Sequence, residues 1–218
     1  MTSIDDPALA TGASKGTVLI VDDDTSVRRG LSSLFRSAGL SVEAFTSAAE
    51  MEQSPSSESA NCLVLDVRMP AQSGLELQEK LAHTNRKIPI IFITAHADVP
   101  ITLRAMKSGA VDLFTKPVDG RAILEAVTAA IAHDRARRER ENAAQALRLV
   151  FENLTPRERE VMAFVTAGLM NKQIAAEMGL REITVKIHRG NIMRKMKAGS
   201  LPDLVRMADG LGLSRPAT

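Results

Sequence analysis

The 218-residue sequence has no tryptophan, no tyrosine and one cysteine, Cys62, and aromatic residues make up only 3% of it. Aliphatic side chains must therefore form most of the core. One thiol cannot build an internal disulfide framework, which fits a reducing compartment, and we expect a cytoplasmic protein. No apolar run is long enough to cross a bilayer, and the polar N-terminus lacks the apolar stretch of a signal peptide, so no membrane partner is expected.

The charges are distributed unevenly along the chain. Residues 1–120 contain 11 basic and 15 acidic side chains, whereas residues 151–218 contain 11 basic and 7 acidic ones. This asymmetry indicates two modules with different partners, and the basic module is a candidate for binding nucleic acid. The excess is small, so charge alone is weak evidence.

Apolar runs of strand length alternate with segments of helical periodicity over residues 17–132. Strands are predicted at about 17–21, 41–45, 63–66, 89–93 and 111–115, and helices at about 25–37, 46–52, 73–83 and 99–108. The polar residues 1–16 are expected to be a disordered tail, and the Ser- and Pro-rich segment 54–57 a loop. This alternation predicts an α/β fold with a doubly wound, parallel, five-stranded sheet.

A long helical pattern begins after Gly120 and continues to about residue 150. Its first half is expected to pack on the sheet, and its second half, residues 133–150, to form a helical linker. The charged run at residues 133–141 favours a solvated helix face with i,i+4 ion pairs over direct contact with DNA.

A small all-α domain of four helices is predicted over residues 151–212, followed by a short tail at 213–218. Helices are expected at about 156–167, 171–178, 183–196 and 201–208, and Thr155, Pro156 and Glu158 form a helix-start signature before the first. The second and third helices are joined by a few residues around Gly179. This arrangement is typical of a helix-turn-helix.

Polar side chains stand where the predicted strands end. Asp22 and Asp23 follow the first strand, Asp66 ends the third, and Thr94 and Lys116 end the next two. The carboxyl ends of parallel strands meet at one edge of a sheet, so these side chains are expected to converge. Carboxylates suit Mg²⁺, whereas a hydroxyl and an ammonium can hold phosphate oxygens. The set therefore predicts phosphoryl transfer to a carboxylate nucleophile, giving an aspartyl phosphate.

The motifs around these residues resemble the signature of two-component receiver domains. They are Val21-Asp22-Asp23-Asp24, Leu65-Asp66-Val67-Arg68-Met69-Pro70, Ile93-Thr94-Ala95-His96 and Thr115-Lys116-Pro117. The resemblance implies that Asp66 is the phosphoacceptor, charged by a sensor histidine kinase. It also implies that Thr94 is the switch hydroxyl and that Lys116 binds the phosphate.

The same resemblance implies a Mg²⁺ site. Asp23, Asp66 and the backbone carbonyl of Arg68 would be the ligands, and Asp22 would act largely through water. Receiver domains commonly carry an aromatic switch residue three positions before the lysine, where this sequence has Leu113. A packing shift is therefore expected in place of a ring rotation, and Phe114 is expected in the core.

The rear module resembles the four-helix DNA-binding domain of the LuxR/FixJ type. The resemblance lies in Leu154-Thr155-Pro156-Arg157-Glu158-Arg159-Glu160-Val161, Asn171-Lys172-Gln173-Ile174-Ala175, Thr184-Val185-Lys186-Ile187-His188 and Lys195-Met196. Together with the receiver motifs, and with His96-Ala97-Asp98-Val99-Pro100, it indicates the NarL/FixJ family and its FixJ-like branch.

The helix at 183–196 is expected to place one face in the major groove and the opposite face, with Val185, Ile192 and Met196, in the core. The residues expected on the groove face are Lys186, Ile187, Arg189, Gly190 and Asn191. Lys186 and Arg189 are candidates for guanine edges or phosphates, and Asn191 for adenine. The candidates for phosphate contacts are Lys172, Thr184, Arg194 and Lys195.

These resemblances imply a response regulator that is phosphorylated on Asp66, forms a homodimer and binds promoter DNA to regulate, and we expect to activate, transcription with RNA polymerase. The only catalysis expected is its own phosphoryl transfer and autodephosphorylation. Two alternatives remain open. A magnesium-dependent phosphatase would need a second acid close after the nucleophile, where Arg68 stands. A receiver-like module that only dimerises would lack one of the acids or the lysine, and none is missing.

Overall fold

Five parallel strands form the sheet of the first part of the chain: β1 (Thr17–Val21), β2 (Ser41–Phe45), β3 (Cys62–Asp66), β4 (Ile90–Thr94) and β5 (Asp112–Thr115). Their order is β2-β1-β3-β4-β5, and every neighbouring pair is parallel. The computed structural model describes residues 16–84 and 86–213. Apart from Gly16 and Leu213, the two predicted tails lie outside the described residues. The predicted five-stranded parallel sheet is confirmed.

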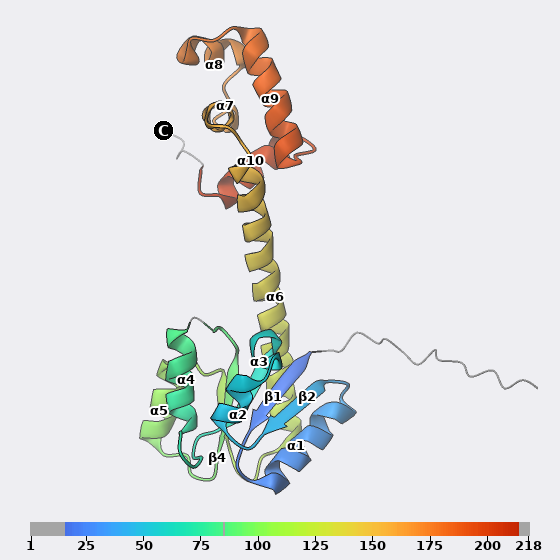
Figure 1. Ribbon diagram of the computed structural model, residues 1–218, viewed down its shortest axis with the longest axis vertical. Helices are drawn as coiled ribbons and strands as arrows, with labels where there is room; N and C mark the ends of the chain where they lie inside the picture. The colour runs from blue at the N-terminus through green and yellow to red at the C-terminus, as the bar shows by residue number, and fades with distance from the viewer. Residues whose placement is uncertain (1–15, 85, 214–218) are drawn as a thin grey trace, which may run out of the picture. The chain divides into compact units, whose positions relative to one another are not determined.

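Two structural units divide the chain, the first ending at Ala136 and the second beginning at Arg137. The helices of the first unit are α1 (Thr25–Ser37), α2 (Ala48–Gln53), α3 (Ser56–Ser59), α4 (Gly74–His83), α5 (Val99–Lys107) and the beginning of α6 (Gly120–Glu152). Figure 1 shows these helices around the sheet. None of the helices in the described part of the chain combines the length and the apolar composition needed to cross a membrane.

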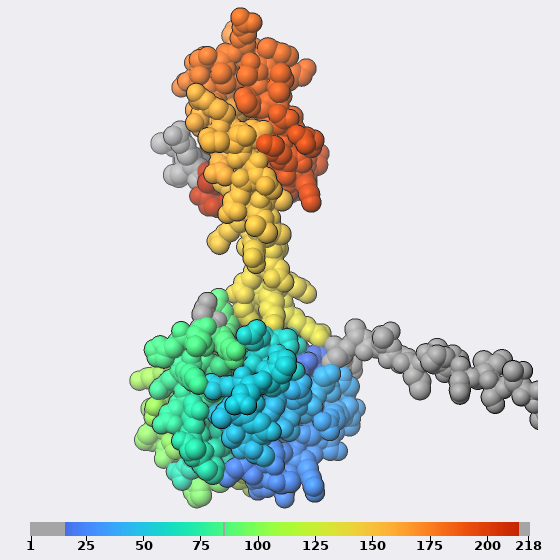
Figure 2. Space-filling view, viewed as in Figure 1, coloured from blue at the N-terminus to red at the C-terminus, as the bar shows by residue number. Residues whose placement is uncertain are grey.

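Helices cover both faces of the sheet because the strands are apolar on both sides. Leu19, Leu63 and Phe92 face one core, which they share with apolar residues of α2, α4 and α5. Ile20, Val64 and their neighbours on the other face share a second core with α1 and α6. Figure 2 shows the same view in space-filling form, with the side chains on this face of the molecule.

The segment predicted as a loop at residues 54–57 contains the beginning of a short helix, so that prediction is wrong. Pro55 has a helical φ of −55°, and α3 follows it directly. The Ser54 hydroxyl donates to the Glu43 carboxylate at 3.0 Å, and the Ser56 hydroxyl donates to the same group. Serine and proline favour a turn locally, whereas the two hydrogen bonds to Glu43 on β2 stabilise the helix α3.

Asp134 on α6 is fully buried, although it lies within the charged run that was interpreted as solvated. Its Oδ2 accepts a hydrogen bond of 3.0 Å from the Asn61 side-chain amide. The Oδ1 atom of Asn61 accepts one of 3.1 Å from the Thr17 backbone N–H. These bonds tie α6 to the amino ends of β1 and β3. Further along the run, Arg137 and Glu141 form the expected i,i+4 ion pair at 2.7 Å.

The second unit contains the end of α6, then α7 (Pro156–Thr166), α8 (Asn171–Met178), α9 (Glu182–Met196) and α10 (Leu201–Gly210). Thr155 and Glu158 form a reciprocal capping box at the start of α7. Gly179 ends α8 in the left-handed conformation, with φ of 65°, and α9 begins three residues later. The core packs residues of α7, α8, α9 and α10 together, so the predicted four-helix arrangement is confirmed.

Candidate functional site

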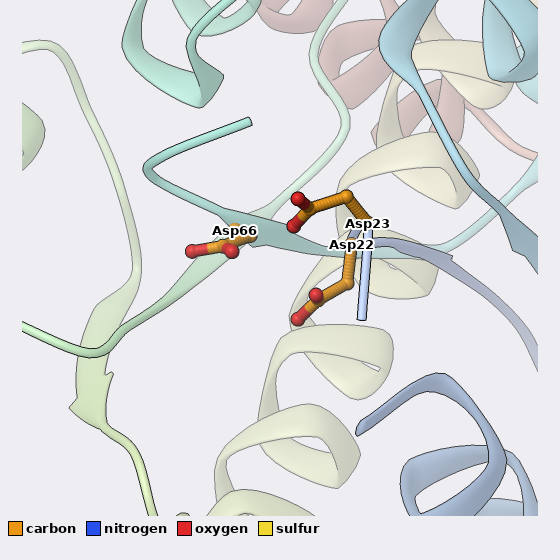
Figure 3. Close-up of side chains that lie close together, drawn as sticks. All are labelled: Asp22, Asp23 and Asp66. Carbon is orange, nitrogen blue, oxygen red and sulfur yellow. The ribbon is translucent and has the colours of Figure 1, made fainter. Parts of the chain in front are cut away.

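Three carboxylates meet at the carboxyl edge of the sheet (Figure 3). Asp22 and Asp23 follow β1, Asp66 ends the neighbouring β3, and one oxygen of each lies within 4.8 Å of the others. Asp22 and Asp66 are buried, whereas Asp23 is exposed. The convergence predicted from the strand ends therefore occurs. It places three acidic groups where one cation could bind them all.

Lys116 joins this cluster from the end of β5. Its Nζ donates a hydrogen bond of 2.9 Å to Asp66 Oδ2 and lies 2.8 Å from Asp22 Oδ2 as an ion pair. Burial lowers the pKa of Lys116, but the Asp22 and Asp66 carboxylates outweigh it and hold that pKa above its usual value. The ammonium is therefore a permanent positive charge beside the candidate phosphoacceptor.

Asp22 is the most constrained acid of the cluster. Burial raises the pKa of Asp22, the Lys116 ammonium and the Asp24 N–H counter this in part, and the charge of Asp66 adds to the increase. The Oδ1 atom accepts the Asp24 N–H at 2.8 Å. The Oδ2 atom is buried and makes no well-directed hydrogen bond, although the Lys116 ammonium lies 2.8 Å away. It is therefore available to a further cation or to water.

Asp24, the third acid of the run, has a different role. Its Oδ1 accepts hydrogen bonds from the backbone N–H groups of Ser26 at 2.7 Å and Val27 at 3.4 Å, which caps α1. These bonds lower the pKa of Asp24. The three consecutive aspartates thus serve as a buried acid, an exposed acid and a helix cap.

Thr94 lies at the same edge, because β4 is the other neighbour of β3. The side chain is fully buried. Its hydroxyl donates to the His96 carbonyl at 3.1 Å and accepts the His96 N–H at 3.3 Å. The Lys116 N–H donates to the Thr94 carbonyl at 2.8 Å. The backbone therefore links the predicted switch hydroxyl to the predicted phosphate-binding lysine.

The loop after Asp66 approaches the carboxylate closely. The Arg68 N–H donates to Asp66 Oδ1 at 3.3 Å. The binding of a metal ion by the Arg68 carbonyl stays a prediction. Gly74, the first residue of α4, donates its N–H to the Val67 carbonyl at 3.0 Å. A Cβ on Gly74 would lie 2.2 Å from the Asp66 carbonyl oxygen. Sequence reasoning missed this glycine, because a single Gly before a helix carries no signal of its own.

Leu113 and Phe114 point to opposite sides of β5. Leu113 is half-buried and packs against the core shared with α4 and α5, whereas Phe114 packs against the core shared with α1 and α6. Near Leu113, the surface formed by α5 and the residue before β5 exposes large apolar side chains. They are Val99, Leu103, Met106 and Val111, which we call the α5–β5 surface.

Helix α9 presents most of the predicted DNA-binding side chains to solvent. Lys186, Ile187, Gly190 and Arg194 are exposed, and Asn191 is half-buried. The face with Val185, Ile192 and Met196 is buried, as predicted. Elsewhere, Lys172 at the start of α8 is exposed and Thr184 is half-buried.

The predicted outward orientation of Arg189 needs correction. Arg189 is half-buried and lines a cavity of about 130 Å³ together with Ile192 and Leu204. Its Nη1 donates to Asn171 Oδ1 at 3.1 Å, which joins α9 to α8. Arg189 precedes the buried Ile192 by three residues, so it flanks the core face rather than opposing it.

Lys195, predicted to bind a phosphate, forms hydrogen bonds within the second unit. Its Nζ donates to Glu158 Oε2 at 2.7 Å and to the Asn153 carbonyl at 3.2 Å. Burial raises the pKa of Glu158, but Lys195 and the backbone N–H and hydroxyl of Thr155 outweigh it and lower that pKa. The position favours a structural role for Lys195, which ties α9 to the start of α7.

A doubly wound α/β unit with an acidic pocket and a lysine at its sheet edge, followed by a helix-turn-helix, defines a receiver-type transcription factor. Two family models agree: the response regulator receiver domain matches residues 18–128, and the luxR family of bacterial regulatory proteins matches residues 152–208. The chain belongs to the NarL/FixJ family of two-component response regulators.

Several characterised proteins resemble the chain over nearly its full length. Nodulation protein W of Bradyrhizobium diazoefficiens is 55% identical over 202 residues, 93% of this chain and 89% of that protein. The response regulator protein TodT of Pseudomonas putida is 46% identical over 194 residues, 89% and 86% of the two chains. The transcriptional regulatory protein FixJ of Rhizobium meliloti is 42% identical over 192 residues, 88% and 94%.

Solved structures agree with this assignment. The response regulator StyR is 47% identical with a TM-score of 0.84, over 88% of this chain and 98% of that one. Full-length FixJ from B. japonicum is 37% identical with a TM-score of 0.57, over 93% and 100% of the two chains. The protein is thus a transcriptional response regulator, whose two domains imply a kinase and DNA as partners.

Proposed function

We propose that Asp66 accepts a phosphoryl group from a phosphohistidine of a sensor histidine kinase and that this modification controls DNA binding. The observation that carries the proposal is the hydrogen bond of 2.9 Å between Lys116 and the buried Asp66 carboxylate, inside an acidic cluster. An Asp66 oxygen attacks phosphorus, the O–P bond forms, and the P–N bond breaks with its electron pair leaving on the imidazole. Lys116 then holds a phosphoryl oxygen. Water then attacks phosphorus and the Asp66 O–P bond breaks, which restores the carboxylate and releases inorganic phosphate.

The cluster fits Mg²⁺. Three carboxylates and only one ammonium meet in a partly buried pocket, and Asp22 Oδ2 lacks a well-directed hydrogen bond. Hard oxygen donors with room for water suit this ion. Asp23, Asp66 and the Arg68 carbonyl would hold it, with Asp22 acting through water. When bound, the ion would neutralise charge on the phosphoryl oxygens.

We infer that the phosphoryl group draws the Thr94 hydroxyl away from the His96 backbone. Because Leu113 packs in the core between β5 and α4–α5, movement at Thr94 shifts this packing and the adjacent α5–β5 surface. That surface exposes four apolar side chains, which is typical of a protein interface. We propose that it forms a two-fold homodimer in the phosphorylated protein.

The dimer can be tested by placing a charge on this surface. Leu103 is exposed on α5, so Leu103→Asp should leave phosphorylation of Asp66 unchanged and abolish dimer formation. Light scattering with and without the phosphate donor measures the mass. A phosphorylated Leu103→Asp variant that dimerises like the wild type would contradict the proposed interface.

On DNA, we propose that α9 enters the major groove, where Lys186, Ile187, Gly190 and Asn191 face the bases. Lys172, Thr184 and Arg194 are proposed to contact phosphates, and dimerisation raises affinity by binding two half-sites at once. Arg189 is proposed to reach a guanine edge or a phosphate, and Lys195 a phosphate, while their bonds to Asn171 and Glu158 hold α9 in place. Recruitment of RNA polymerase and activation of promoters are part of the proposal.

The central experiment compares the full chain with Asp66→Asn and, as a matched control, Asp119→Asn. Asp119 is exposed and caps α6 through its carboxylate, a role that asparagine also fills. With acetyl phosphate and Mg²⁺, the wild type and the control should be labelled, dimerise and bind selected promoter fragments more tightly, whereas Asp66→Asn should do none of these. Equal dimerisation and DNA binding by wild type and Asp66→Asn would instead favour a module that works without phosphorylation.

A further inference from the structure

The outward face of α9 carries an apolar stripe that the fold does not use. Ile183 and Ile187 lie one turn apart, and their exposed fractions are 59% and 57%. Neither belongs to the core of the second unit. Exposed helix positions are ordinarily filled by polar residues with a higher helix propensity than isoleucine, so folding alone does not account for this pair.

The same face of α9 continues beyond the apolar stripe through Gly190 and Arg194, which follow Ile187 by three and seven residues and are exposed. A Cβ added to Gly190 would meet nothing within 4 Å. Packing within the protein therefore does not require glycine at this position. The glycine instead leaves α9 without a side chain beside the two isoleucines, so another molecule can approach the helix closely there.

The charges around the stripe indicate the kind of molecule. Lys186 and Arg194 on α9 and Lys172 on α8 are exposed cations, and Glu182 at the start of α9 is an exposed acid, so the helix that carries the apolar pair presents more positive than negative charge. The major groove of DNA lies between two rows of phosphates, and its floor offers one apolar group, the 5-methyl group of thymine. In helix-turn-helix proteins the first turns of the second helix reach the base edges, and Ile183 and Ile187 lie in the first half of α9.

We propose that Ile183 and Ile187 are specificity-determining residues that recognise thymine by contact with its 5-methyl group. This inference rests on the proposed binding of α9 in the major groove and goes further, because it names the base chemistry. Each bound half-site then contains at least one thymine whose methyl group is buried against these side chains.

The test removes methyl groups from the DNA and isoleucines from the protein. Duplexes are first selected from a random library with the phosphorylated full chain, and each thymine is then replaced in turn by deoxyuridine, which lacks the methyl group. For the wild type, affinity should fall about fourfold at one or two positions in each half-site, equivalent to about 0.8 kcal/mol per methyl group. At those positions the Ile183→Ala/Ile187→Ala variant should bind both bases equally. Alanine favours helix, so the variant keeps its fold.

Leu149→Ala is the matched control, because Leu149 is 56% exposed but lies on α6. It should retain the methyl dependence of the wild type. The inference is overturned if the wild type is indifferent to every thymine methyl group, or if the double variant shows the same loss at the same positions. In both cases DNA is still bound, so the proposed function survives. If the full chain selects no duplex, both proposals fall together.

Discussion

Replacing Gly74 by alanine should destabilise the first unit and weaken phosphorylation of Asp66. The added Cβ would lie 2.2 Å from the Asp66 carbonyl oxygen and 3.0 Å from Leu65 Cγ. The carbonyl belongs to the end of a central strand, so it cannot move alone, and α4 or the loop after Asp66 must shift by about 1 Å. Such overpacking costs about 2 kcal/mol, which lowers the melting temperature of a domain of this size by roughly 8 °C.

Gly30→Ala is the matched control. Gly30 lies inside α1, and a Cβ there would meet nothing within 4 Å. Because alanine favours helix over glycine by about 0.8–1 kcal/mol, this variant should be more stable than the wild type. The same chemical change is therefore expected to act with opposite signs at the two glycines.

The chain has no tryptophan or tyrosine, so intrinsic fluorescence is a poor probe of its unfolding. Scanning calorimetry of the full chain is suitable, with hydrogen exchange in β3 identifying the transition of the first unit. Labelling of Asp66 by acetyl phosphate gives the second readout. A Gly74→Ala variant that melts and is labelled like the wild type would refute the close approach, as would a destabilised Gly30→Ala variant.

Three further predictions concern single contacts. Because folding lowers the pKa of Glu158, its ionised side chain stabilises the second unit. This stabilisation is complete above the ordinary glutamate pKa of about 4.3 and is lost as pH falls further. Glu158→Gln should therefore flatten the acid limb of unfolding free energy against pH, measured by urea titration with circular dichroism. Lys197→Gly should stabilise the second unit by up to about 1 kcal/mol in the same assay, because Lys197 has a φ of 58°. Asp134→Ala should destabilise the first unit by about 1–3 kcal/mol in calorimetry, because the Asn61 amide loses a buried acceptor; an unchanged transition would contradict this.

The positions of Asp22, Asp66, Thr94 and Lys116 at one sheet edge could be predicted from sequence, because parallel strands direct their carboxyl ends the same way. The ion pairs of Lys116 with two carboxylates could not, because they depend on side-chain conformations that no periodicity encodes. The same limit applies to Asn61 and Asp134, which are 73 residues apart in sequence and meet only in the folded unit.

Arg189 shows a different limit. Its charge and its place in a helix-turn-helix pattern indicate a DNA contact, yet a position three residues from a buried isoleucine lies close to the core face. The short helix α3 was missed for a third reason. Its stability comes partly from the distant Glu43 on β2, whereas its own composition is typical of a turn.

Lys116 already binds two carboxylates in the unmodified protein. On the proposed mechanism, a phosphoryl group on Asp66 exchanges one anionic partner of this ammonium for another, so the same lysine takes part in both the unmodified and the phosphorylated state. The DNA binding of the unmodified protein and its response to phosphorylation then both depend on Lys116. Substitutions at Asp22 remove one ion-pair partner of Lys116, so they should change both the activity of the unmodified protein and its response to phosphorylation.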